Sequence, residues 1–201
     1  MSLFDLNGRV AIITGGNGGI GLGMALGLAS SGASIAIVGR NSEKNKTASK
    51  KLEATGANVI AIEKDVTNDL AGTEVATEVQ NKFGRIDILI NNAGSNIRKR
   101  PEDLSLDEFR WVQDTNLTSA FVFSQAMYPH FKKVGGGKII NIGSMYSLFG
   151  GPVSTAYSVS KGGIVQMTKS MAAAWATDKI QVNAVLPGWI DTELTRTARE
   201  Q

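Results

Sequence analysis

Three side chains in the sequence could together carry out proton transfer: Ser144, Tyr157 and Lys161. The serine follows an apolar run, Lys138–Ile142, which is predicted to be a buried strand ending at Gly143. Tyr157 and Lys161 are four residues apart in a predicted helix, so they lie on one face of it. A positive charge beside a phenol favours the phenolate. The predicted chemistry is therefore general acid/base catalysis by Tyr157, with its pKa lowered by Lys161.

The size of this effect can be judged from elementary electrostatics. A free tyrosine titrates near pH ~10, so a phenolate at neutral pH requires about 4 kcal/mol. A unit charge about 4 Å away supplies a similar ~4 kcal/mol at an effective dielectric near ~20, before burial acts in the opposite direction. One lysine is thus nearly sufficient. Because a Tyr-x-x-x-Lys pair also arises by chance, the assignment depends on further motifs.

The composition limits the classes of protein. The 201 residues are 42% hydrophobic, with a net charge of +3, and no linker divides them, so we expect a single domain. Lys and Arg are scattered, which argues against a nucleic-acid partner. The chain has no cysteine and only one histidine, His130, so thiolate chemistry, a histidine-based triad and a multi-histidine metal site are excluded. Without an apolar run of ~20 residues or a signal peptide, a soluble cytoplasmic protein is expected, with neither a metal nor a membrane partner.

A strand, a glycine turn and a helix open the chain. The predicted strand Arg9–Ile13 leads into Thr14-Gly15-x-x-x-Gly19-x-Gly21, and the helical pattern that follows ends near Gly32. Glycines let backbone N–H groups and a helix amino terminus approach a pyrophosphate, where side chains would obstruct it. The turn therefore predicts dinucleotide binding.

The second predicted strand, Ser34–Val38, ends at Gly39-Arg40-Asn41. In a dinucleotide-binding fold an acid at this point accepts hydrogen bonds from the ribose of NAD, whereas an arginine favours the 2′-phosphate of NADP. The acid is absent, so NADP is predicted to be preferred over NAD. Arg40 could alternatively stack on adenine and accept either cofactor.

The next two strands end in polar residues as well. Asn58–Ile62 is followed by Asp65, which would contact adenine, cap a helix over Asn68–Lys82, or do both. Ile86–Ile90 leads into the sequence Asn91–Gly94, Asn-Asn-Ala-Gly, whose small residues suit a close ligand and whose amides could tie strands together.

Two long helices and a sixth strand complete the pattern. One helix is predicted near Ser105–Lys132, with Asn116 in its middle, where asparagine either serves a purpose, such as disrupting local bonding or holding a water, or is simply exposed. The helix that carries Tyr157, with Ser154 or Thr155 as its cap, extends to about Thr177, before the strand Ile180–Leu186. Six strand–helix alternations predict an α/β fold of the Rossmann type: a doubly wound parallel sheet in three layers.

These motifs occur together in a familiar order. They are Thr14–Gly21, Asn91–Gly94, Asn116, Ser144, Tyr157-x-x-x-Lys161 and Pro187-Gly188. In this order they resemble the short-chain dehydrogenase/reductase family over essentially the whole chain. Three stretches, at residues 2–9, 91–100 and 187–196, look like members that act on sugars and sugar acids, such as gluconate 5-dehydrogenases, 2-deoxy-gluconate 3-dehydrogenases and glucose 1-dehydrogenases.

The resemblance implies an NAD(P)-dependent oxidoreductase that moves a hydride between nicotinamide and a secondary alcohol or ketone. Tyr157 would be the acid/base, Lys161 would also bind the nicotinamide ribose, Ser144 would orient the substrate oxygen and Asn116 would hold a relay water. The implied cofactor-binding residues are Gly15, Asn17, Gly19, Ile20, Arg40, Asn41, Asp65, Val66, Asn92, Ala93, Gly94, Tyr157, Lys161, Pro187, Gly188, Ile190 and Thr192.

The substrate is expected to be a small molecule, a sugar acid, sugar or related compound. Ser144, Tyr157 and Arg98 are its predicted contacts, and Arg98 would meet a carboxylate unless its basic loop is merely solvated. A homodimer or homotetramer is expected. Family members usually continue beyond the point where this sequence stops, so residues 1–201 are expected to form one catalytic domain that lacks the usual carboxyl-terminal lid and last strand.

Two other classes share parts of the pattern. A non-catalytic dinucleotide sensor could use the same fold, although it would not need Tyr157, Lys161, Ser144 and Asn116. A methyltransferase also has a glycine turn after its first strand, but it would need neither the tyrosine nor the lysine.

Overall fold

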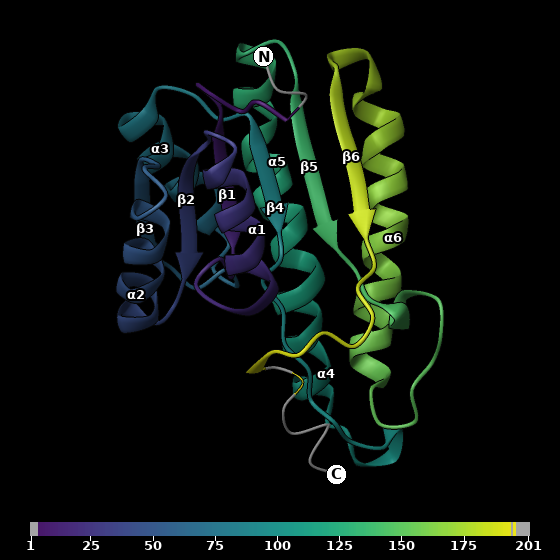
Figure 1. The fold of residues 1–201 in the computed structure, drawn as a ribbon. Helices are drawn as coiled ribbons and strands as arrows, with labels where there is room; N and C mark the ends of the chain where they lie inside the picture. The colour runs from purple at the N-terminus through teal and green to yellow at the C-terminus, as the bar shows by residue number, and fades with distance from the viewer. Residues whose placement is uncertain (1–3, 194, 196–201) are drawn as a thin grey trace.

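Six parallel strands form one central sheet, with helices on both of its faces (Figure 1). The computed structural model describes residues 4–193 and 195. The strands follow the order β3-β2-β1-β4-β5-β6 across the sheet. Their bounds are β1 Val10–Thr14, β2 Ser34–Gly39, β3 Val59–Glu63, β4 Ile88–Asn91, β5 Gly137–Ile142 and β6 Ile180–Val185. The predicted doubly wound parallel sheet is confirmed.

The helices divide between the two faces of the sheet, which gives the three predicted layers. Buried side chains of α1 and α2 pack with one face of the strands, and those of α3, α5 and α6 pack with the other. The α-helices are α1 Gly19–Ser30, α2 Ser42–Glu53, α3 Ala71–Phe83, α4 Leu106–Gln113, α5 Ser119–Lys133 and α6 Thr155–Trp175. Short 3-10 turns, η1, η3 and η4, lie at Pro101–Asp103, Met145–Ser147 and Ala176–Asp178.

Two of the predicted helices differ from the structure. The helix predicted from Asn68 begins at Ala71, because Asn68 instead accepts a hydrogen bond from Leu70 N in a turn. The helix predicted over Ser105–Lys132 is divided by a π-helical segment, η2, at Asp114–Thr118. Such an inserted wide turn is common at functional sites.

The order of the strands determines where a ligand can bind. The chain runs outward from β1 to β3, then returns to pair β4 with the other edge of β1. Where connections diverge in this way, a crevice opens beyond the carboxyl ends of the central strands. The turns after β1, β2, β4 and β5, which carry the predicted motifs, all lie at that end of the sheet.

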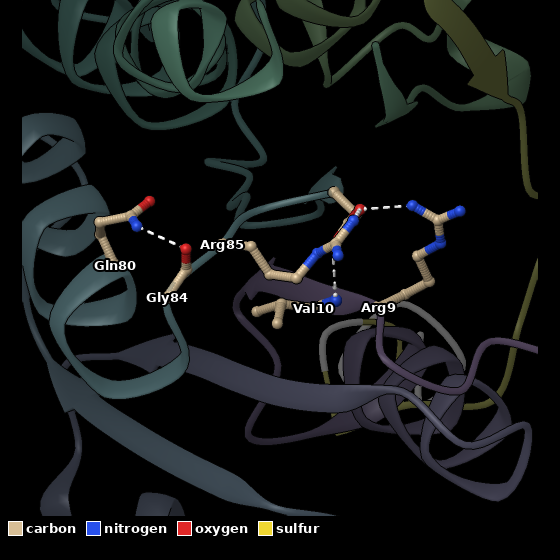
Figure 2. Close-up of polar contacts among 6 residues, drawn as sticks. Arg9, Val10, Gln80, Gly84 and Arg85 are labelled. Atoms are coloured by element: carbon tan, nitrogen blue, oxygen red, sulfur yellow. Dashed lines mark hydrogen bonds and ion pairs between the residues drawn. The ribbon is translucent and has the colours of Figure 1, made fainter. Parts of the chain in front are cut away.

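The amino ends of β1 and β4 are joined by charged groups that no motif indicated. The carboxylate of Asp87 accepts hydrogen bonds from Arg9 (2.9 Å), Arg85 (2.6 and 2.8 Å) and Val10 N (3.0 Å). Figure 2 shows the Arg9 and Arg85 guanidinium groups converging above Val10. Burial would raise the pKa of Asp87, but the hydrogen bonds from the two arginines and Val10 outweigh it and hold that pKa below its usual value. This cluster stabilises the end of the sheet opposite the crevice.

Among the described residues, no helix is both long and apolar enough to cross a membrane.

Candidate active site

The turn between β1 and α1 presents bare backbone to a cleft of about 670 Å³. Gly15 has a φ of +63°, and a Cβ there would lie 2.9 Å from Asn92 Nδ2. A Cβ on Gly21 would lie 2.3 Å from the Gly15 carbonyl oxygen, so glycine is required at both positions. No side chain caps the amino end of α1, whose first residues line the cleft. Uncapped N–H groups in a side-chain-free cradle fit a pyrophosphate.

Eight of the residues predicted to bind the cofactor line this cleft: Gly15, Asn17, Gly19, Ile20, Asn92, Ala93, Gly94 and Thr192.

A second hollow, of about 320 Å³, adjoins the cleft at the ends of β2 and β3 and contains Arg40, Asn41, Asp65 and Val66. Arg40 Nη1 lies 3.5 Å from Asp65 Oδ2, and the other carboxylate oxygen accepts hydrogen bonds from Thr67. Burial would raise the pKa of Asp65, but the Thr67 hydrogen bonds and Arg40 hold it below its usual value. Asp65 therefore does not cap α3, and the adenine-side alternative remains for it.

Gly39 is fixed by two asparagines. A Cβ on Gly39 would lie 2.4 Å from Asn17 Nδ2 and 2.9 Å from Asn45 Oδ1. Asn17 donates to Asn45 Oδ1 (2.7 Å), and Asn45 donates to the Gly39 carbonyl oxygen (2.9 Å). An aspartate at position 39 would therefore displace the side chains of Asn17 and Asn45. Sequence reasoning missed Asn45, although an asparagine four residues after Asn41 on a lysine-rich helix was a usable signal.

The turn after β4 is held against β1. Thr14 Oγ1 accepts hydrogen bonds from the backbone N–H groups of Asn92 and Ala93, both at 3.0 Å. Asn91 donates to Asn141 Oδ1 on β5 at 2.8 Å. The prediction that these amides tie strands together is confirmed. The sequence did not predict this role of Thr14, which lies inside the glycine motif, because its contacts with the turn after β4 form only on folding.

Ser144, Tyr157 and Lys161 come together at the end of β5. Ser144 and Tyr157 line the same two hollows, and Lys161 lines one of these. Lys161 Nζ lies 5.6 Å from the centre of the Tyr157 ring and donates to the Ile142 carbonyl oxygen at 2.7 Å. The two parts of the sequence that were predicted to supply the chemistry are therefore adjacent.

The predicted lowering of the Tyr157 pKa does not hold in this geometry. Burial raises the pKa of Tyr157; the hydroxyl of Ser144 acts in the opposite direction, and Tyr146 adds to the rise. Burial also lowers the pKa of Lys161 to about 8. The lowering of the Tyr157 pKa expected from the sequence assumed a lysine charge about 4 Å from the phenol and gave burial too little weight.

Asn116 lies in the π-helical segment and is 1% exposed, so the exposed alternative is wrong. Its amide donates to the Ser95 carbonyl oxygen (2.9 Å) and to Ser160 Oγ (3.0 Å), and it accepts from Ser95 N (2.7 Å). The side chain therefore links the turn after β4 to α6. Its role in holding a relay water stays a prediction.

The mouth of the site is formed by residues from three loops. Arg98, Ser144, Tyr157, Pro187 and Gly188 line a hollow of about 140 Å³. A smaller hollow of about 100 Å³ continues inward, and its walls include Lys161, Ile190 and Thr192. Arg98 thus lines the same hollow as the tyrosine and the serine.

Other residues of the mouth escaped the sequence analysis. Tyr146 lies edge-on to Tyr157, with ring centres 6.1 Å apart, and Asn96 donates to Ser154 Oγ at 3.3 Å. Ser154 is one of the two predicted caps of α6. It is at the N-cap position of this helix, but its side chain makes no capping hydrogen bond and instead accepts the one from Asn96. Tyr146 follows Ser144 by two residues, which was the available signal. In the described part of the chain, no three acidic or histidine side chains gather as a metal site would require.

The fold and the cleft at the glycine turn define a dinucleotide-binding oxidoreductase. Residues 9–201 match the short chain dehydrogenase family, and the chain belongs to that family. It is therefore an NAD(P)-dependent oxidoreductase that acts on CH–OH groups.

Several characterised or solved relatives are similar over nearly the whole chain. The chain is 38% identical to 2-dehydro-3-deoxy-D-gluconate 5-dehydrogenase of Dickeya dadantii, over 99% of this chain and 78% of the relative. It is 37% identical to gluconate 5-dehydrogenase of Gluconobacter oxydans, over 96% and 75%. A crystal structure assigned as an NAD(P)-dependent gluconate 5-dehydrogenase from Beutenbergia cavernae, with NADP bound at low occupancy, gives a TM-score of 0.93 at 34% identity, covering 100% of this chain and 80% of that one.

Proposed function

We propose that the protein interconverts a secondary alcohol and a ketone on a sugar acid, with NADP(H) as the preferred cofactor. The observation that carries the proposal is that Ser144, Tyr157 and Arg98 line one hollow, next to the cleft of the glycine turn.

The proposed division of labour follows the contacts. Ser144 and Tyr157 line the reaction hollow, so their hydroxyls would hold the substrate oxygen, and Tyr157 would accept or donate its proton. Lys161, with its ammonium 5.6 Å from the Tyr157 ring centre, would stabilise the phenolate and bind the cofactor ribose. The bound nicotinamide would supply or accept the hydride. Asn116 would position the turn after β4 against α6, in addition to its predicted relay water.

The residues at the adenosine end of the cofactor site support a preference for NADP. Gly39 has no carboxylate that would repel a 2′-phosphate, and Arg40 supplies a fixed positive charge in the same hollow. The solved relative with NADP in its structure agrees with this assignment. The ion pair between Arg40 and Asp65 leaves room for the alternative in which the arginine stacks on adenine.

The substrate class follows from Arg98 and the relatives. Arg98 is exposed at the mouth of the hollow that contains Tyr157, where it could form a paired hydrogen bond with a carboxylate. The two curated relatives are named for gluconate and for 2-dehydro-3-deoxy-D-gluconate, both of which are acids.

We also propose that the protein forms a homodimer or homotetramer in the cytoplasm. Two aromatic side chains, Trp111 on α4 and Phe121 on α5, are 37% and 46% exposed, as expected of a face that a second copy covers.

The decisive test is the nicotinamide absorbance change on mixing the purified protein with NADP or NAD and matched substrates: gluconate and 2-dehydro-3-deoxy-D-gluconate against glucose and xylitol. The proposal expects turnover of an acid.

Replacing Arg98 with Ala should then raise KM by about tenfold for acids and leave KM for any neutral sugar unchanged. The neighbouring Arg100→Ala is the control, since Arg100 pairs with Glu102 at 2.5 Å and lies outside the hollow. Equal effects on acids and neutral sugars would remove Arg98 from the proposal. Cofactor binding without turnover of any substrate would favour the alternative of a non-catalytic dinucleotide sensor.

A further inference from the structure

Lys44 occupies a position between the two parts of the cofactor site. It is in the first turn of α2, where its backbone N–H donates to the capping side chain of Asn41 at 2.9 Å. Its side chain lines both the 670 Å³ cleft of the glycine turn and the 320 Å³ hollow that contains Arg40. A charge at this boundary can reach groups in either space.

In this structure Lys44 has an acidic partner from the other side of the cleft. Lys44 Nζ lies 2.6 Å from Glu193 Oε2, and the two side chains are 51% and 68% exposed. Glu193 belongs to the segment after β6, whose Thr192 approaches Gly19 so closely that a Cβ on the glycine would lie 3.3 Å from it. The ion pair therefore connects α2 to a segment that lies against the glycine turn.

The charges of the 320 Å³ hollow favour an anion. Arg40, Lys44 and Lys64 line it, and Asp65 is the one acid among the lining residues described. Lys64 is paired with Glu74 at 2.8 Å on α3, and Arg40 is paired with Asp65 at the longer distance of 3.5 Å. Of these three cations, Lys44 is thus the one that also lines the cleft of the glycine turn, and its partner Glu193 belongs to the segment after β6.

Exchange of one partner for another is favourable for this lysine. An exposed ion pair changes an equilibrium constant by at most about fivefold, whereas a hydrogen bond between charged groups contributes roughly ten- to a hundredfold. A phosphate group carries close to two negative charges and three acceptor oxygens, so it competes well with a single exposed carboxylate.

We propose that Lys44 is a second determinant of NADP(H) preference, and that it exchanges Glu193 for the 2′-phosphate when the cofactor binds. This inference rests on the proposed dinucleotide function and extends it to a residue outside every predicted motif. The exchange breaks the ion pair that joins α2 to the segment after β6, and this segment also lines the inner reaction hollow through Ile190 and Thr192. Lys44 then strengthens binding of the 2′-phosphate, and Glu193 weakens it.

Fragments of the cofactor test this exchange without any turnover. Binding of adenosine 2′,5′-bisphosphate and of adenosine 5′-monophosphate is measured by calorimetry for wild type, Lys44→Gln, Glu193→Gln and Lys46→Gln. Lys46 is the matched control, because it is on the same helix, 66% exposed and paired with Glu43, and it lines neither space. Lys44→Gln should weaken the bisphosphate by about tenfold and leave the monophosphate unchanged. Glu193→Gln should strengthen the bisphosphate by about two- to fivefold.

The outcomes separate this inference from the proposed function. If Lys44→Gln and Lys46→Gln weaken the bisphosphate equally, general surface charge explains the effect and Lys44 is not a determinant. If Glu193→Gln weakens or does not alter bisphosphate binding, the exchange is wrong. If the wild type binds neither fragment, nor NADP or NAD, the dinucleotide function itself fails.

Discussion

The Lys161 ammonium lies 5.6 Å from the centre of the Tyr157 ring and donates a 2.7 Å hydrogen bond to the Ile142 carbonyl oxygen. The lysine is 3% exposed, and burial lowers its pKa to about 8, while burial raises the pKa of Tyr157. Each of the two groups is therefore held closer to its neutral form than in water. Burial of such a pair costs stability, and groups with pKa values shifted in this way are typical of functional sites.

Replacing Tyr157 with Phe should leave NADP(H) affinity within about twofold and lower kcat by at least about a hundredfold, because it removes only the transferable proton. Wild-type alcohol oxidation should accelerate as pH rises, since a raised pKa means that the phenolate forms only on the alkaline side. Tyr146→Phe is the control, because its ring lines the same hollow. A Tyr157→Phe protein that kept a tenth of the wild-type kcat would show that another group transfers the proton.

Replacing Lys161 with Met should raise stability while abolishing turnover. Below pH 8 the folded state contains a buried ammonium, which costs up to about 3 kcal/mol relative to the unfolded chain. Between pH 8 and the ordinary lysine value of 10.5 the folded state releases its proton first, so wild-type stability rises with pH across that window. The advantage of the Met variant is therefore largest at pH 7 and smaller near pH 10.

Urea unfolding at both pH values measures this difference. Lys169→Met provides the control, since Lys169 is an exposed residue on the same helix. A Lys161→Met variant that is less stable than wild type at pH 7, or whose difference from wild type does not vary with pH, contradicts the argument.

Asp87, at the opposite end of the sheet, is also expected to make a pH-dependent contribution to stability. Asp87→Asn should lower the free energy of unfolding by about 2–4 kcal/mol at pH 7, because two partly buried arginines lose their acceptor charge. Since the pKa of Asp87 is depressed in the folded state, its contribution is present above the ordinary value of 3.8 and is lost as pH falls through the folded pKa. The gap between variant and wild type should therefore narrow below about pH 4. Asp107→Asn, at a 94% exposed side chain, should change stability by less than about 0.5 kcal/mol. Equal losses from both substitutions would refute the special role of Asp87.

The sequence predicted features that depend on local pattern. Apolar runs indicated the six strands, and the glycines that follow the first run indicated the turn at Gly15 and Gly21, where the structure leaves no room for a Cβ. The charged cluster at Asp87 and the contacts of Asn45 could not be predicted, because each joins residues that are brought together only by folding. The direction of the Tyr157 pKa was predicted wrongly for a related reason: the sequence gives the separation of Tyr157 and Lys161 along a helix, but not the burial of either group.

Cofactor preference is the remaining prediction, and it depends on Gly39 and Arg40. A Cβ at position 39 would lie 2.4 Å from Asn17 Nδ2, so a carboxylate that would select NAD could be placed there only if the Asn17 side chain moved. Arg40 is 62% exposed and only loosely paired with Asp65, so its charge remains accessible to a 2′-phosphate. A hydrogen bond between such charged groups is worth about 1.5–3 kcal/mol, or roughly ten- to a hundredfold in affinity.

We therefore expect wild type to favour NADP over NAD by about ten- to a hundredfold in kcat/KM, and Arg40→Ala to lose most of that preference through NADP alone. Arg110→Ala, at an exposed arginine on α4, should leave the ratio unchanged. Because Arg40 and Lys44 line the same hollow, the double variant Arg40→Ala with Lys44→Gln should prefer NADP less than either single variant. A wild type that favours NAD, or an Arg40→Ala protein with the wild-type ratio, would instead mean that the arginine stacks on adenine and serves both cofactors alike.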